Sequence, residues 1–366
     1  MLFEPGTIGT LELPNRLVRS ATAECLADRD GAPTPALEDL YRALAQGGVG
    51  LIVTGHFYVH PSGVAHPAMV GIHDDALIEP LSRLADAVHE QGGRVVCQLN
   101  HAGMQTRAKA VREPISPSAI TAPFLRRAAR AMTGAEVETM IEAYADAAVR
   151  AKQSGFDGVQ LHGAHGYLIN QFLSPFVNRR ADGWGGDAAR RRRFLEVVCT
   201  AIRDRVGPAY PVLIKLGMQD AVDGGLTIDE AVEIVSELER MGIDGVELSG
   251  GIDGGRGFIM PKGIANVDDE GFFRAFAVRA REATRLAILL VGGFRSRSVM
   301  EDVLVSGNVD FISLCRPLIC EPDLPNRLRD RVQQRSSCVS GNRCWPESRR
   351  DPGISCKCFS GAGSPT

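Results

Sequence analysis

Two histidines and a tyrosine stand close together in the segment His162–Pro175, which reads HGAHGYLINQFLSP. His162 and His165 are three residues apart, and Tyr167 follows two residues later, just after an apolar run that ends at Leu161. Two imidazole N–H groups can hold a carbonyl or phenolate oxygen, and a phenol that is protonated at neutral pH can donate a proton to a forming enolate. These groups predict the addition of hydrogen across an activated double bond. For an isolated H-x-x-H the alternatives are a metal-binding pair or two polar loop histidines.

The elements that must position these groups alternate along the chain. Eight short apolar runs are expected to be strands: Leu17–Ser20, Val49–Gly55, Arg94–Asn100, Gly158–His162, Val212–Gly217, Gly245–Gly250, Ala287–Gly293 and Phe311–Arg316. Helical patterns between them include Leu81–Gln91, Gly134–Ser154, Ala188–Val206, Ile228–Met241, Asp269–Ala283 and Ser298–Ser306. This α/β alternation favours a (β/α)8 TIM barrel over an open doubly wound sheet, which periodicity alone does not exclude.

The residues at or near the ends of the eight runs are mostly polar or glycine, and the fifth run contains Lys215. In chain order these are Ser20, Ala21 and Thr22; Gly55 and His56; Gln98, Asn100 and His101; His162, His165 and Tyr167; Lys215; Ser249, Gly250 and Gly251; Gly292 and Gly293; and Arg316. The C-terminal ends of the strands carry the active site of a (β/α)8 barrel. Eight consecutive cases therefore predict the rim of one pocket.

Two parts of this rim have the chemistry of cofactor contacts. Gly292-Gly293-Phe294-Arg295, with Arg316 after the next run, suits a phosphate, because glycines let backbone N–H groups approach and arginine supplies a bidentate fork. A tight turn is the alternative for the glycine pair. Lys215 lies in an apolar run and needs a partner, since an unpaired buried charge is costly. It suits the pyrimidine edge of a reduced flavin, beside Gln98, or else a structural ion pair with Glu247 or Asp220.

Several motifs together resemble the old yellow enzyme family of FMN-dependent ene-reductases. They are Phe3-Glu4-Pro5, Pro14-Asn15-Arg16-Leu17-Val18, Gln98-Leu99-Asn100-His101-Ala102-Gly103, the His162–Pro175 segment, Asn178-Arg179-Arg180, Gly185-Gly186 and Gly292-Gly293-Phe294-Arg295. The resemblance runs from Phe3 to about Arg335. It implies FMN at the mouth of a barrel that spans residues 1–335.

The resemblance also implies roles for individual residues. The cofactor-binding set expected in this way is Ser20, Ala21, Thr22, His56, Gln98, Lys215, Gly292, Gly293, Arg295, Cys315 and Arg316. NADH or NADPH would give hydride to flavin N5, which would pass it to the β-carbon of an α,β-unsaturated carbonyl compound. His162 and His165 would hold the substrate oxygen, and Tyr167 would protonate the α-carbon. Cys315 departs from the glycine that is common before the phosphate arginine.

A tail over residues 336–366 is rich in Cys, Gly and Ser and has no helical period. Its cysteines resemble the iron–sulfur segment of the larger 2,4-dienoyl-CoA reductase-like members, with Gly341 at the second ligand position. Three matching thiols remain, Cys338, Cys344 and Cys356, together with Cys358, which is out of place in this pattern. A degenerate tail without metal is favoured over a zinc site or a [4Fe–4S] cluster.

Composition and charge narrow the class of protein further. The chain has 366 residues, 44% of them hydrophobic, and a formal net charge of -3, which predicts no nucleic-acid or membrane partner. No signal-like segment is visible at the start, and a cytoplasmic location is expected. The rival functions are a metal-dependent hydrolase that uses His162, His165 and His101, a remnant of a 2,4-dienoyl-CoA reductase-like flavoenzyme, and a flavin-binding protein without activity. A homo-oligomer, the coenzyme preference and the physiological substrate are left open.

Overall fold

The eight predicted strands form one closed parallel barrel in the computed structural model, which describes residues 1–122, 124–125, 127–252, 256–346 and 353–358. The strands are β3 (Leu17–Arg19), β4 (Leu51–Tyr58), β5 (Val95–Asn100), β8 (Gly158–Gly163), β9 (Val212–Gly217), β10 (Gly245–Ser249), β11 (Ala287–Val291) and β12 (Phe311–Leu314). They neighbour each other in that order, and β12 pairs with β3 to close the ring. The (β/α)8 barrel is confirmed, and the open sheet is ruled out.

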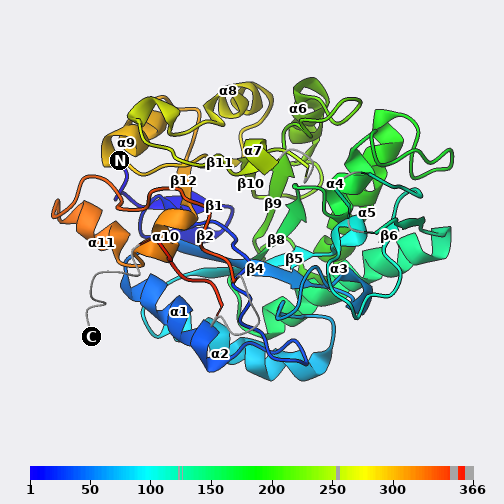
Figure 1. Ribbon diagram of the computed structural model, residues 1–366, viewed down its shortest axis with the longest axis horizontal. Helices are drawn as coiled ribbons and strands as arrows, with labels where there is room; N and C mark the ends of the chain where they lie inside the picture. The colour runs from blue at the N-terminus through cyan, green and yellow to red at the C-terminus, as the bar shows by residue number, and fades with distance from the viewer. Residues whose placement is uncertain (123, 126, 253–255, 347–352, 359–366) are drawn as a thin grey trace.

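Seven longer helices surround the strands (Figure 1). They are α1 (Pro35–Gln46), α2 (Ile78–His89), α3 (Gly134–Gln153), α5 (Ala188–Val206), α6 (Ile228–Glu237), α8 (Arg274–Ala283) and α9 (Arg297–Val305). Capping boxes, Thr133 with Glu136 and Thr227 with Glu230, begin α3 and α6. The helix expected from Asp269 begins only at Arg274, because Gly271 adopts a left-handed conformation (φ +69°) that interrupts it.

Short elements connect and extend this frame. The helices are α4 (Leu168–Leu173), α7 (Arg256–Ile259), α10 (Arg316–Cys320) and α11 (Leu324–Arg329), and the extra strands are β1 (Gly6–Ile8), β2 (Leu11–Leu13), β6 (Ile115–Ser116) and β7 (Arg130–Ala131). Single 3₁₀ turns lie at Pro61–Gly63, Asp75–Leu77, Gly103–Gln105 and Val267–Asp269. In the predicted tail, residues 347–352 and 359–366 lie outside the described part of the chain. Its division from the barrel at residue 335 stays a prediction.

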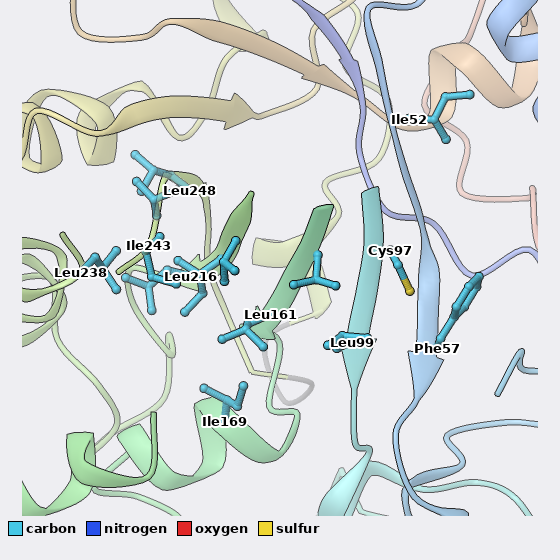
Figure 2. Packing of buried hydrophobic residues seen from close by; sticks show 14 of the residues in the cluster. Ile52, Phe57, Cys97, Leu99, Leu161, Ile169, Leu216, Leu238, Ile243 and Leu248 are labelled. Carbon is cyan, nitrogen blue, oxygen red and sulfur yellow. The ribbon is translucent and has the colours of Figure 1, made fainter. Parts of the chain in front are cut away.

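Strand alternation divides the core into an outer and an inner part. Leu99, Leu161 and Leu216 lie on successive strands and are fully buried in the outer layer, against the helices (Figure 2). The inner cluster joins Val96 and Leu213 to Ile8, Leu11 and Leu13 of the β1–β2 hairpin. The hairpin thus packs against the first halves of the strands. Among the described residues, no helix is long and apolar enough to cross a membrane.

The same alternation leaves the second half of the barrel interior to polar groups. Gln98 and Lys215 lie two residues beyond Val96 and Leu213, so their side chains also point inward. The predicted rim residues are therefore carried by rigid strands, above a closed apolar floor.

Candidate active site

A chain of five buried polar side chains crosses the barrel interior. Lys215 Nζ donates to Ser20 Oγ at 2.7 Å and lies 3.2 Å from Glu247 Oε1, and Ser20 Oγ donates to the same carboxylate at 2.7 Å. Gln160 Nε2 donates to Glu247 Oε2 at 3.1 Å, and Gln98 Nε2 donates to Gln160 Oε1 at 2.7 Å. Glu247, which has no exposed surface, balances the charge of Lys215. The ion pair that the sequence offered as an alternative for Lys215 is present.

This pairing leaves Lys215 able to bind a ligand. The ammonium group has three N–H donors, and the two contacts above account for two of them. Sequence reasoning missed Gln160, which connects the predicted residue Gln98 to the carboxylate. Its inward register beside Gln98 was the available signal.

The two histidines and the tyrosine of the first motif come together as predicted. The ring centroids of His162 and His165 are 5.2 Å apart, and those of His162 and Tyr167 are 4.7 Å apart. His162 lies in β8, and the other two lie in the turn that connects β8 to α4. His56 joins the group, with its ring centroid 5.1 Å from that of Tyr167.

The turn that presents these groups is held from behind. Gly166 has φ +72°, and His165 has φ +60°, so two successive residues adopt left-handed conformations. The Gly166 N–H donates to Asn170 Oδ1 at 2.6 Å, and Gln171 Nε2 donates to the Gly166 carbonyl at 2.6 Å. Asn170 and Gln171, which follow Tyr167 in the same segment, thus fix the backbone between His165 and Tyr167.

The histidines of the site are neutral at physiological pH. Burial, with a smaller effect of Lys215, lowers the pKa of His165 to about 3. Burial also holds the pKa of His162 and of His56 well below the usual histidine range. A neutral imidazole carries one N–H, and His165 Nε2 lies 2.7 Å from Ser249 Oγ. These rings are therefore hydrogen-bonding groups at pH 7 rather than cations.

His56 is in contact with a histidine that the sequence analysis did not single out. Its Nε2 lies 3.3 Å from His66 Nε2, and its Nδ1 lies 2.9 Å from Asn100 Nδ2. His66 Nδ1 is 2.9 Å from the Pro67 carbonyl, which only accepts. With Asn100 Nδ2 as donor, His56 accepts at Nδ1 and donates from Nε2 to His66. No local sequence signal marks His66, which lies in the loop after β4.

His56 faces this group because of a bulge in its strand. The register of β4 against β5 shifts between Val53 and His56, so that β4 has one extra residue. Val53 belongs to the inner cluster and Phe57 to the outer one, an even spacing that unbroken alternation does not allow. His56 therefore lies inside β4, whereas the sequence analysis placed it after the strand.

The expected phosphate cradle is partly occupied by the chain itself. Glu270 accepts from the Arg295 and Ser296 N–H groups, both at 2.7 Å. The Arg295 guanidinium donates to the Ile264 and Ser336 carbonyls. Of the predicted phosphate contacts, Gly292, Gly293 and Arg316 remain suited to that role, and they follow the neighbouring strands β11 and β12.

Arg316 is buried and fixed by the tail. Its Nη1 donates to Asn342 Oδ1 at 2.6 Å and to the Pro261 carbonyl at 2.8 Å. The residue before it, Cys315, has its sulfur 3.2 Å from Thr22 Oγ1. The predicted contacts Thr22, Cys315 and Arg316 therefore lie together, with the tail beside them.

Comparison with known proteins places this site in a family. Residues 1–335 match the NADH:flavin oxidoreductase / NADH oxidase family. The chain belongs to this family. It is 34% identical over 326 residues to an NADPH dehydrogenase of a Geobacillus species, covering 89% of this chain and 92% of that protein. It is 36% identical over 346 residues to a Thermoanaerobacter brockii NADH oxidase, covering 93% of this chain but 52% of that protein.

Solved structures agree with this assignment. An old yellow enzyme homologue from Zymomonas mobilis superposes with a TM-score of 0.80 at 26% identity, over 92% of this chain and 95% of that one. A 2-naphthoyl-CoA reductase gives a TM-score of 0.84 at 29% identity, over 90% of this chain and 52% of that one. The predicted membership of the old yellow enzyme family is confirmed. The chain spans about half the length of the first curated relatives that it matches.

The family is FMN-dependent, and the donor set of this chain fits FMN. Lys215 and Gln98 offer a cation and an amide at the barrel mouth, and Arg316 offers a buried guanidinium beside the Gly292-Gly293 turn. The assignment of each cofactor-binding residue, including Ser20, Ala21 and Arg295, stays a prediction.

His101, the third metal ligand of the alternative metal-dependent hydrolase, makes other contacts in this structure. His101 Nε2 lies 2.9 Å from Ser62 Oγ, its Nδ1 accepts from the Gly103 N–H at 3.0 Å, and its ring stacks on that of His60. It does not join His162 and His165, as that rival requires. Within the described ranges, no three His, Cys, Asp or Glu side chains form a group that holds a metal ion.

Proposed function

We propose that this chain reduces the activated double bond of α,β-unsaturated carbonyl compounds with electrons from NADH or NADPH. FMN, when bound, supplies the hydride chemistry. The observation that supports this proposal most directly is the grouping of His162, His165 and Tyr167 at the mouth of an FMN-family barrel.

The neutral histidines bind and orient the substrate in this proposal. His162 and His165 donate N–H groups to the carbonyl oxygen and polarise the conjugated double bond. Both rings are uncharged, so neither carries an extra proton that it could give to the substrate. Tyr167 is therefore the proton donor in this proposal. Negative charge that develops on the oxygen is stabilised by donors that are already in place, so little reorganisation is needed.

Tyr167 supplies the proton for the α-carbon. Its ring packs against those of His162 and His56. Lys215 and Gln98 would hold the pyrimidine edge of the flavin, with Glu247 balancing the lysine. Arg316 and the Gly292-Gly293 turn would hold the phosphate.

Tyr167→Phe tests the assignment of the proton donor. The substitution keeps the ring and removes the hydroxyl, so reduction of the protein by NAD(P)H should stay close to the parent rate. Reduction of a simple enone should slow by roughly 10²–10⁴-fold, as expected for loss of a general acid. Stopped-flow measurement follows the two half-reactions separately.

Tyr210→Phe is the matched control for this experiment. Its hydroxyl donates to the Phe156 carbonyl at 2.9 Å, outside the site, so both half-reactions should be unchanged. An undiminished oxidative half-reaction in Tyr167→Phe would remove Tyr167 from the role of acid.

Coenzyme A thioesters of unsaturated acids are a second substrate class. The likeness to 2-naphthoyl-CoA reductase favours them, and a thioester carbonyl presents the same oxygen to the histidine pair. Comparing kcat/KM for a cyclic enone and for an enoyl-CoA decides between the two classes.

A further inference from the structure

The ring of His165 is in contact with a residue from a different strand. Its Nε2 lies 2.7 Å from Oγ of Ser249, the last residue of β10. In the barrel β9 lies between β8 and β10, so the turn after β8 reaches over one whole strand to make this contact. Ser249 lies two residues beyond Glu247, and both side chains therefore point into the barrel. Because Ser249 is buried, water competes little for its hydroxyl.

A glycine in β9 gives the turn room to cross. Gly217 is in register with Ser249, and a Cβ atom built on Gly217 would lie 3.5 Å from the Cα of Ala164, in the turn. The turn thus lies directly above the end of β9. The backbone of His165 is held as well, since Gln105 Nε2 donates to its carbonyl at 3.3 Å. Groups outside the turn therefore contact both the main chain and the ring of His165.

The proton position in His162 follows from a contact within the turn. The Ala164 N–H donates to His162 Nδ1 at 3.4 Å, so Nδ1 carries a lone pair and no proton. Because the ring is neutral, its single proton lies on Nε2. His162 therefore presents an Nε2–H group to a ligand.

The proton position in His165 depends on the direction of its hydrogen bond with Ser249. If the ring donates, its one proton lies on Nε2, and Nδ1 can only accept. If the hydroxyl donates, the proton lies on Nδ1, and the ring can donate to a ligand. A carbonyl or phenolate oxygen accepts hydrogen bonds and gives none. Only the second arrangement lets His165 bind such an oxygen while it keeps its contact with Ser249.

We propose that Ser249 is a positioning residue: its hydroxyl donates to His165 Nε2 and so keeps the proton of His165 on Nδ1, where it binds the substrate oxygen. Together with the Nε2–H of His162, this gives two donors for one oxygen. The role rests on the proposed function, because it takes the two histidines as the oxygen-binding pair. It also predicts a preference for ionised phenols, whose oxygen accepts both hydrogen bonds with a full negative charge.

Nitrogen NMR of the full-length protein with its flavin bound and with isotope-labelled histidine tests the proton position directly. The two ring nitrogens of a neutral imidazole differ widely in chemical shift according to which one bears the proton. The signals of His165 are those that His165→Asn lacks. The parent should show the proton of His165 on Nδ1. Ser249→Ala should move it towards Nε2, whereas Ser249→Thr, which keeps a hydroxyl, should retain it on Nδ1.

Binding of pentafluorophenol, which is ionised at neutral pH, measures the consequence for a ligand. Its affinity is followed by the change in the flavin spectrum. Ser249→Ala should weaken binding roughly tenfold, as expected when a hydrogen bond to a charged group is lost. Ser249→Thr should bind the phenolate as the parent does.

Ser154→Ala is the matched control, since Ser154 is also a buried serine with one hydrogen bond from its hydroxyl. Its Oγ donates to the Ile78 carbonyl at 3.2 Å, just after α3 and before the start of β8, at the opposite end of the barrel from the site. The affinity for the phenolate and the proton position in His165 should both stay those of the parent.

A proton on Nε2 of His165 in the parent would overturn the role of Ser249, and this measurement does not depend on how stable the variants are. Weaker phenolate binding in Ser249→Ala with the proton still on Nδ1 would also overturn it, because the hydroxyl would then act through packing alone. None of these readouts involves Tyr167 or turnover. If Tyr167→Phe reduces enones as fast as the parent while the proton moves in Ser249→Ala, the proposed reaction fails and the role of Ser249 stands.

Discussion

Burial of uncharged imidazoles makes the site sensitive to acid. In the folded chain His165 has a pKa of about 3, whereas an unfolded histidine has a pKa of about 6.5. Between these values the unfolded state binds the extra proton, so the free energy of unfolding falls as the pH falls below about 6.5. The contribution of His165 is complete above that pH and is lost towards pH 3.

His165→Asn should remove this part of the pH dependence. Asparagine tolerates the left-handed conformation of residue 165 and does not titrate. Urea unfolding at pH 7.5 and 5.5 should show a difference between the two pH values that is about 1.4 kcal/mol smaller in the variant than in the parent.

His89→Asn serves as a control of opposite sign. The hydrogen bond with Asp157 raises the pKa of His89, so its contribution is present at low pH and lost as the pH rises. Its removal should make the protein more sensitive to acid, not less. An identical pH dependence in His165→Asn and the parent would contradict the burial of a neutral His165.

At the scale of elements, the β8–turn–α4 unit shows what sequence can predict. A strand that ends at Gly163 and a turn rich in glycine place His162, His165 and Tyr167 together, and this arrangement follows from local spacing alone. The bulge in β4 does not, because the extra residue before His56 is set by pairing with β5. The contacts of Glu270 could not be predicted either, because it accepts from the Arg295 and Ser296 N–H groups in a segment 25 residues away.

Gly166 is the residue on which this unit depends. It has φ +72°, and an added Cβ would lie 2.6 Å from both Gln105 Nε2 and Ile252 Cγ1. Gly166→Ala should lower the free energy of unfolding by more than about 1 kcal/mol and displace Tyr167. Phenol binding, followed by the change in the flavin spectrum, should weaken. Gly155→Ala is the control, because it has φ +84° but nothing within 4 Å, and it should affect stability without affecting phenol binding.

At the scale of the whole molecule, the two ends of the barrel have separate tasks. The β1–β2 hairpin packs under the apolar floor, while the polar chain, the histidine group and the tail lie towards the other end. Alternation with a period of two predicts both layers, which is why the barrel and most rim residues were predictable. The contact between Arg316 and Asn342 was not, because it joins positions that only the folded tail brings together.

Leu13→Ala tests the separation of the two ends. Leu13 is 2% exposed in the inner cluster, so its truncation should lower the free energy of unfolding by about 2–5 kcal/mol. The affinity for FMN and the rate of reduction by NAD(P)H should remain those of the parent, as measured by fluorescence titration and stopped flow. Val305→Ala, at a side chain that is 68% exposed, should change neither property. Loss of FMN affinity in Leu13→Ala would show that the floor and the mouth are coupled.

The buried pair of Lys215 and Glu247 has a consequence for the history of the family. Loss of either charge alone would leave the other uncompensated inside the barrel, at a cost of roughly 3–5 kcal/mol. During evolution this pair can be replaced only if both residues change together, or if the protein that has lost one charge is already more stable than it needs to be. Among descendants of a common ancestor, positions 215 and 247 should therefore be inherited as a unit, while the neighbouring surface diverges freely.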